Sequence, residues 1–116
     1  MLDLIIRNGK CYIDGKLETK DIAVKDGKIF KIGEINEEAK EIYDAKNQTV
    51  LPGCIDTQTH FREPGSTDTE DLHSGSRAAI VGGITAVFEM PNTNPPTSNK
   101  KEFQRKLDLA KNRMYC

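Results

Sequence analysis

The chain has 116 residues, with 17 Lys and Arg against 18 Asp and Glu and a formal net charge of −1. Because the charge is near neutral and no basic cluster occurs, the composition argues against a nucleic-acid-binding protein. No apolar stretch is long enough to cross a membrane, and residues 1–7 lack the basic and apolar regions of a signal peptide. We therefore expect a cytoplasmic protein with neither nucleic acid nor membrane as a partner.

Residues 1–52 contain short runs of alternating apolar and polar residues, separated by turn residues. Asn8-Gly9, Asp14-Gly15 and Asp26-Gly27 each end such a run, and Asn-Gly and Asp-Gly favour tight hairpin turns. Residues 34–41 are charged and are compatible with a helical turn or a loop. The pattern predicts a small antiparallel sheet or half of a β-sandwich, and we interpret this half as a scaffold because it shows no catalytic constellation.

The pattern changes after Pro52-Gly53. Residues 54–60 favour a strand, residues 70–81 a helix closed by Gly82-Gly83, and residues 84–88 a second strand. A second helix begins at Asn99, with Glu102 three residues later in a pattern like a capping box. Its apolar residues recur on one helical face: Phe103, Leu107, Ala110 and Met114.

The order strand, helix, strand, helix predicts a parallel sheet with right-handed crossovers. We therefore predict an α/β chain: a β-sandwich segment over residues 1–52, then the first two βα units of a (β/α)₈ TIM barrel over residues 53–116. A closed barrel needs about 250 residues, so the barrel is expected to be incomplete in this chain. We expect the chain to be the front piece of a longer protein.

Three polar residues share one face of the first strand of the second half. Asp56, Gln58 and His60 alternate with residues that point the other way, and they sit at the carboxyl end of the strand, where α/β active sites gather. Residues two apart on a strand can face one ion, and imidazole is a common ligand of divalent metals. The alternative is that His60 is a hydrogen-bonded structural residue.

Two further residues follow the strand ends. Arg62 offers a planar guanidinium that suits a carboxylate, and Asn92 offers both a donor and an acceptor directly after the second strand. The alternatives are a surface arginine and a turn asparagine.

These motifs resemble the N-terminal part of the dihydroorotase class of cyclic amidohydrolases. The specific runs are His-Phe-Arg-Glu-Pro-Gly at 60–65 and Asn-Thr-Asn-Pro-Pro-Thr at 92–97, preceded by Leu-Pro-Gly-Cys-Ile-Asp at 51–56. The resemblance extends over essentially the whole chain.

The resemblance implies a small β-sandwich joined to a (β/α)₈ barrel and the interconversion of N-carbamoyl-L-aspartate and L-dihydroorotate in pyrimidine synthesis. It implies one or two zinc ions that activate a hydroxide and polarise the ring carbonyl. It also implies that Arg62 and Asn92 hold the substrate carboxylate. Hydantoinases and allantoinases act on rings without that carboxylate and do not need this arginine. A homo-oligomer is expected, with aspartate carbamoyltransferase as a further candidate partner.

One position departs from the family pattern. The first strand of the family usually carries His-x-His as metal ligands, whereas Gln58 occupies the first of these positions and only His60 remains. Glutamine is a poor zinc ligand beside imidazole. The site therefore holds a single metal, or tolerates Gln58, or belongs to a non-catalytic scaffold subunit; a hydantoinase or allantoinase relative is a further alternative. No catalytic residue is assigned within the chain, and the fragment alone is expected to be inactive.

Overall fold

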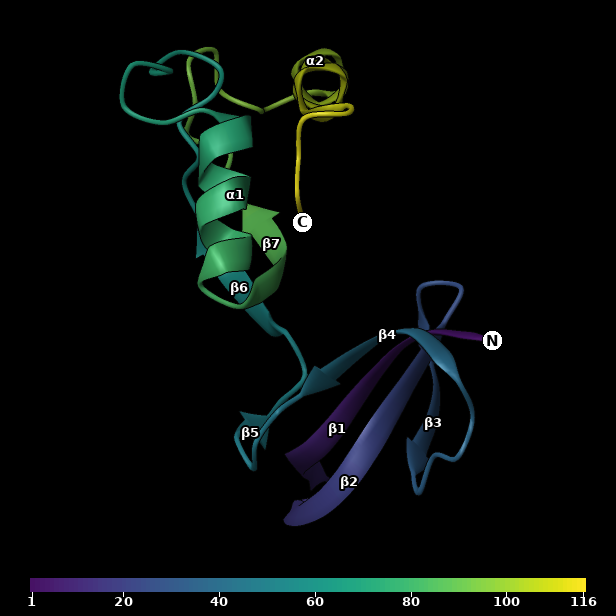
Figure 1. Ribbon diagram of the computed structural model, residues 1–116. Coiled ribbons are helices and arrows are strands. Elements are labelled where there is room, and N and C mark those ends of the chain that lie inside the picture. Colours follow the sequence, from purple (N-terminus) through teal and green to yellow (C-terminus); the bar gives the residue numbers. More distant parts are fainter. The chain divides into compact units, whose positions relative to one another are not determined.

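The computed structural model describes all 116 residues and separates into two compact units, Met1–Pro52 and Gly53–Cys116 (Figure 1). None of the predicted site residues lies in the first unit. Neither helix in the structure has the length and apolar character needed to span a membrane.

The first unit is one five-stranded sheet. Its strands pair in the order β3-β2-β1-β4, and β5 pairs with β1 beside β4. The strands are β1 Leu2–Ile13, β2 Lys16–Lys25, β3 Lys28–Gly33, β4 Ala39–Asp44 and β5 Thr49–Val50. A small core on this sheet consists of the buried side chains of Leu2, Ile5, Ala23 and Ile35.

The turns of this sheet follow the predicted dipeptides in two of three places. Ile13 pairs with Lys16 across Asp14-Gly15, and Lys25 pairs with Lys28 across Asp26-Gly27, which confirms two hairpins.

The hairpin predicted at Asn8-Gly9 is wrong, because β1 continues through it. Asn8 has a φ of 56°, and the register with β2 shifts between Ile6 and Gly9, which makes this a β-bulge. The N–H of Asn8 donates to Asp21 Oδ1 at 2.9 Å, so a side chain satisfies the donor that the bulge turns away from the ladder.

The predicted antiparallel sheet is also only partly correct. β4 and β5 both run parallel to β1, so the sheet is mixed. The charged segment after β3 forms the crossover to β4, with Ile35 buried under the sheet. Sequence alternation alone gives no strand direction, which explains the error.

The second unit has the predicted order of strand, helix, strand, helix. Its elements are β6 Cys54–Thr59, α1 Leu72–Val81, β7 Ile84–Glu89 and α2 Lys100–Ala110. β6 and β7 pair in parallel, which confirms the parallel βα arrangement, and Figure 1 shows α1 lying along the two strands.

The helix boundaries are set by capping residues. Asp71 is the N-cap of α1 and its Oδ1 accepts from Ser74 N at 2.7 Å; Asn99 is the N-cap of α2 and its Oδ1 accepts from Glu102 N at 3.0 Å. The left-handed conformation at the end of α1 is supplied by Gly83, with a φ of 85°.

Two buried residues flank His60 at the end of β6. Thr59 and Phe61 are 9% and 6% exposed, and the Phe61 ring packs against Gly75 of α1. Side chains alternate along an extended strand, so His60, between these two residues, lies on the opposite side from α1. Close packing under Phe61 therefore sets the side from which His60 is presented.

We predict that Gly75→Ala destabilises the fold by about 1–3 kcal/mol, the usual cost of overpacking. A Cβ at this position would lie 2.6 Å from Phe61 Cδ1 and 3.0 Å from Glu70 Cδ. Gly82→Ala is the matched control, because its Cβ would come no closer than 3.4 Å to any atom considered and its φ of −80° suits alanine. Urea unfolding measures both; equal stability of the two variants would contradict the packing argument.

Candidate functional site

The ends of β6 and β7 are joined where the predicted site residues lie. The N–H of Met90 donates to Thr59 O at 2.9 Å, which holds the two strands together to their carboxyl ends. One residue after Thr59 and two residues after Met90, His60 Nδ1 lies 2.8 Å from Asn92 Oδ1. The structure thus brings together two of the five residues singled out in the sequence.

The contact with Asn92 fixes the protonation pattern of the neutral His60 ring. An amide oxygen only accepts hydrogen bonds, so Nδ1 carries the proton and donates to Asn92 Oδ1. Nε2 then keeps its lone pair. A histidine held in this way can present Nε2 to a metal ion or accept a proton there.

Arg62 and Gln58 lie near this pair in sequence but form no hydrogen bond to either member of it. Arg62 is exposed and has a φ of 59°, and its carbonyl accepts from Ser66 N at 2.9 Å. Gln58 is exposed on β6, with its N–H donating to Asp56 Oδ1 at 3.0 Å. The roles predicted for these two residues therefore stay predictions.

The loops that follow the two strands contact each other. The N–H of Asn94 donates to Pro64 O at 3.0 Å, and a Cβ on Gly65 would lie 2.7 Å from Asn94 Cβ. Gly65 has a φ of 116°, so a side chain there would meet both strain and a clash. The loop that carries Arg62 and the loop that carries Asn92 thus form one edge of the unit.

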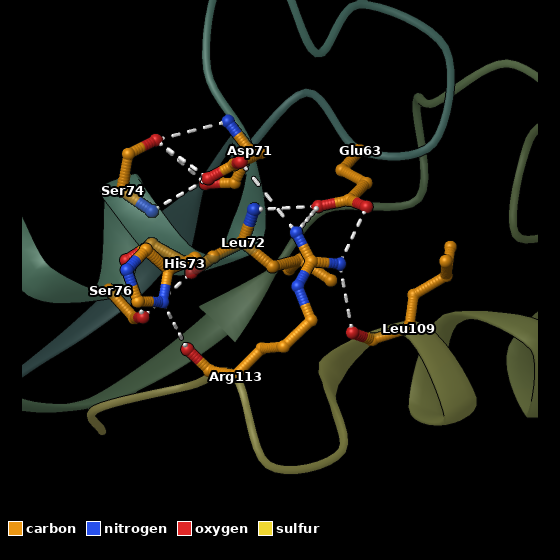
Figure 2. A network of polar contacts seen from close by, with 8 residues as sticks. All are labelled: Glu63, Asp71, Leu72, His73, Ser74, Ser76, Leu109 and Arg113. Atoms are coloured by element: carbon orange, nitrogen blue, oxygen red, sulfur yellow. Dashed lines mark hydrogen bonds and ion pairs between the residues drawn. The ribbon is translucent and has the colours of Figure 1, made fainter.

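A buried carboxylate anchors the first loop. Glu63 is 6% exposed, and Arg113 donates to both of its oxygens, at 2.8 and 3.1 Å. The N–H of Leu72 donates to Glu63 Oε2 at 2.9 Å. Figure 2 shows the Arg113 guanidinium between Glu63 and Asp71, and Arg113 lies 3.6 Å from Asp71 Oδ2.

The charges of this network favour ionised carboxylates. Burial raises the pKa of the Glu63 carboxyl, but the hydrogen bonds from Arg113 and from Leu72 N–H outweigh it and hold the pKa below its ordinary value of 4.5. Hydrogen bonds from the Ser74 N–H and hydroxyl lower the pKa of Asp71. Both groups are therefore charged near neutral pH, and the loop is tied to the start of α1 and to the segment after α2.

A second carboxylate, Glu89, lies at the end of β7. It accepts from Phe61 N at 3.0 Å, and the Thr59 hydroxyl and Lys106 Nζ of α2 lie 3.2 and 3.4 Å away. The side chains of Glu89 and Lys106 are 14% and 11% exposed. Both sequence neighbours of His60 therefore contact Glu89, Thr59 through its hydroxyl and Phe61 through its backbone N–H.

The sequence analysis did not single out these charged groups. Lys106 falls among Phe103, Leu107 and Ala110, so a cation on the apolar face of α2 was the available signal for a buried ion pair. Glu89 ends an apolar strand and follows Val87 by two residues, which places a carboxylate on a buried face. For the pairing of Glu63 with Arg113, 50 residues apart, the sequence offered no signal.

The side chains of this chain do not form a complete metal site by themselves. No group of three or more His, Cys, Asp or Glu could hold an ion. His60 offers one imidazole nitrogen, and Asp56 is already bonded to the backbone of Gln58. These donors are too few for a complete site, since a catalytic zinc takes about three protein ligands.

Residues 49–114 match the model of the amidohydrolase family. The chain belongs to the amidohydrolase family. The match includes β6, β7 and both helices, and thus every predicted site residue.

Relatives of this amidohydrolase in sequence carry two different names, allantoinase and dihydroorotase. It is 45% identical over 113 residues to an allantoinase of Salmonella choleraesuis (strain SC-B67), with 97% of this chain covered. It is 42% identical over 113 residues to a dihydroorotase of Methanosarcina mazei, with 96% covered. In each comparison the chain spans 25% of the relative.

Among solved structures, an L-hydantoinase from Arthrobacter aurescens superposes with a TM-score of 0.86 and 33% identity. That match covers 95% of this chain and 25% of the hydantoinase. A D-hydantoinase from Thermus sp. gives a TM-score of 0.80 at 28% identity, covering 97% and 26% of the two chains. These comparisons support cyclic amidohydrolases as a group and do not single out dihydroorotase.

We predict that Glu63→Gln lowers the free energy of unfolding near pH 7 by about 1.5–3 kcal/mol, the usual value of hydrogen bonds to a charged group. The pKa of Glu63 is depressed on folding, so its contribution is present above 4.5 and is lost as the pH falls through the folded pKa. The wild-type protein should therefore lose more stability than the variant between about pH 6 and pH 3. Urea unfolding across this range measures the difference; parallel pH profiles would contradict the assigned role of Glu63.

Proposed function

We propose that the protein is a cyclic amidohydrolase of the dihydroorotase type, which interconverts N-carbamoyl-L-aspartate and L-dihydroorotate. The observation that carries the proposal is the pairing of His60 with Asn92 beside Arg62. Asn92 Oδ1 is engaged by His60, whereas Asn92 Nδ2 donates to no group of the chain. A ligand oxygen is the partner that this amide nitrogen lacks.

Arg62 suits a carboxylate at the same edge. It forms no ion pair within the chain, and the loop that carries it is fixed by Glu63 on one side and by the Phe61 N–H bond to Glu89 on the other. A guanidinium binds a carboxylate through two parallel hydrogen bonds. Together with Asn92 Nδ2, Arg62 would bind and orient the carboxylate of an acidic ring compound.

His60 supports hydrolysis of a ring amide. We propose that Nε2 is one ligand of a divalent metal, with zinc the ion that imidazole suits, and that further ligands come from parts of the protein outside these residues. The metal, when bound, would activate water and polarise the ring carbonyl. The role of Asn92 is to hold the imidazole with Nδ1–H turned inward, so that Nε2 remains a free donor. We propose that the two βα units begin a (β/α)₈ barrel.

A second candidate is an allantoinase or hydantoinase activity. It is favoured by the Salmonella allantoinase and by the hydantoinase structures named above. A non-catalytic scaffold subunit is the third alternative, and Gln58, at a position where the family usually has a histidine, is the residue that favours it.

The deciding experiment is an assay of the intact protein with N-carbamoyl-L-aspartate, allantoin and hydantoin in parallel, with bound metal measured on the same sample. Turnover of carbamoyl-aspartate alone supports the proposal. Preferential turnover of allantoin or hydantoin replaces it with the second candidate. A folded, metal-loaded protein without turnover of any of the three favours the scaffold.

We predict that Arg62→Ala weakens binding of the carboxylate-bearing substrate by about 2–3 kcal/mol, or roughly 30- to 160-fold, because it removes a charged hydrogen-bonding partner. Arg77→Ala is the matched control, since Arg77 is an exposed arginine of α1. KM and an inhibition constant for a dicarboxylate analogue measure the effect. An unchanged affinity in Arg62→Ala would contradict the carboxylate role.

A further inference from the structure

The Glu89 carboxylate contacts both sequence neighbours of His60, the Thr59 hydroxyl and the Phe61 backbone N–H. The N–H of Phe61 donates to Glu89 Oε2 at 3.0 Å and lies 3.2 Å from Oε1. The Thr59 hydroxyl, which has one proton to donate, lies 3.2 Å from Glu89 Oε2 and 3.2 Å from Phe88 O. Thr59 and Phe61 are the sequence neighbours of His60, so one side chain contacts the chain on both sides of the imidazole.

Glu89 acts where the strand ladder has ended. β6 ends at Thr59, and the last backbone bond across the strands runs from Met90 N to Thr59 O. The N–H of Phe61 lies beyond that bond, and the carboxylate supplies the acceptor that a further strand residue would have provided. The direction of the chain through His60 is therefore set by a side chain of the neighbouring strand.

The hydrogen bonds to Glu89 lie in largely apolar surroundings, where the charge of the carboxylate matters. Glu89 and Lys106 contribute to the lining of a cavity of about 420 Å³ whose other lining includes Phe61, Leu72, Val87, Phe103 and Leu107. Hydrogen bonds are stronger in an apolar setting, and an unpaired charge there is costly. Lys106 Nζ offsets the charge from 3.4 Å and also lies 3.3 Å from Met90 O.

A second carboxylate paired with a cation lies on the other side of Arg62 in the sequence. Glu63 directly follows Arg62, and its carboxylate is bonded to Arg113. The two cations, Lys106 and Arg113, come from α2 and the turn after it, seven residues apart in sequence. The segment from His60 to Glu63 is thus held at both ends by buried carboxylates that are paired with cations from one part of the chain.

We propose that Glu89 is a positioning residue for His60, with Lys106 as its counter-charge. Glu89 acts through the Thr59 hydroxyl and the Phe61 backbone N–H and keeps His60 Nδ1 directed at Asn92 Oδ1. The inference rests on the proposed function for the use made of His60, but its test reads the imidazole itself and needs no substrate. A protein without activity would contradict the proposed function. The inference about Glu89 would still be decided separately, by the NMR result.

The test is the tautomer of the histidine side chains in the intact protein, read by NMR after selective ¹⁵N labelling of histidine. Spectra are recorded at about pH 8, above the range in which free histidine titrates. His60→Gln and His73→Gln assign the two signals. His73 is an internal reference, because its Nδ1 donates to the Arg113 carbonyl at 3.2 Å and it has no contact with Glu89.

The variants are Glu89→Gln and, as a matched control in the first unit, Asp3→Asn. Asp3 also accepts a backbone N–H and a lysine.

The wild-type protein and Asp3→Asn should show His60 as the single Nδ1–H tautomer. In Glu89→Gln the amide accepts at one oxygen and turns a donor toward Phe61 N–H or Thr59, so His60 should lose the single tautomer while His73 keeps its signal. A wild-type His60 signal in Glu89→Gln overturns the proposal. If both histidines change, the fold is lost and Thr59→Val decides, because it keeps the carboxylate and removes only the hydroxyl that contacts Glu89 Oε2 and Phe88 O. A shift of His60 toward a mixture in Thr59→Val supports the proposal, and an unchanged His60 overturns it.

Discussion

The parallel pairing of β6 with β7 is the constraint on which the site depends. Parallel strands end at the same edge of a sheet, so residues that follow them meet although 30 or so residues separate them in sequence. His60 and Asn92 meet in this way at 2.8 Å. Because the acceptor is an amide oxygen, the contact also selects the tautomer of the imidazole and leaves Nε2 with its lone pair.

Charged side chains extend this pairing beyond the strands. Glu89 and Glu63 bracket the segment that carries His60 and Arg62, and each is paired with a cation, Lys106 or Arg113. Salt bridges at exposed positions contribute little, but both carboxylates are largely buried and accept backbone N–H groups as well. The arrangement stabilises a loop conformation that includes Arg62 at a positive φ.

The sequence predicted those features that local pattern determines. Apolar periodicity and capping residues predicted both helices of the second unit, and the alternation of elements predicted that β6 and β7 are parallel. The hairpin predicted at Asn8-Gly9 was wrong because the same dipeptide occurs in β-bulges and in hairpin turns. Local pattern does not distinguish the two. The partners of Glu63 and Glu89 depend on tertiary contacts across many residues, which no spacing rule encodes. The sequence motifs singled out Arg62 and Asn92, whose roles stay predictions, but they did not single out the groups that hold the loops of these two residues.

The most direct test of this account is a crystal structure of the intact protein with L-dihydroorotate bound. The account predicts that the ligand carboxylate lies within hydrogen-bond distance of both the Arg62 guanidinium and Asn92 Nδ2, while Asn92 Oδ1 still accepts from His60 Nδ1. A ligand whose carboxylate binds away from these residues, or an Asn92 amide turned away from His60, would contradict it.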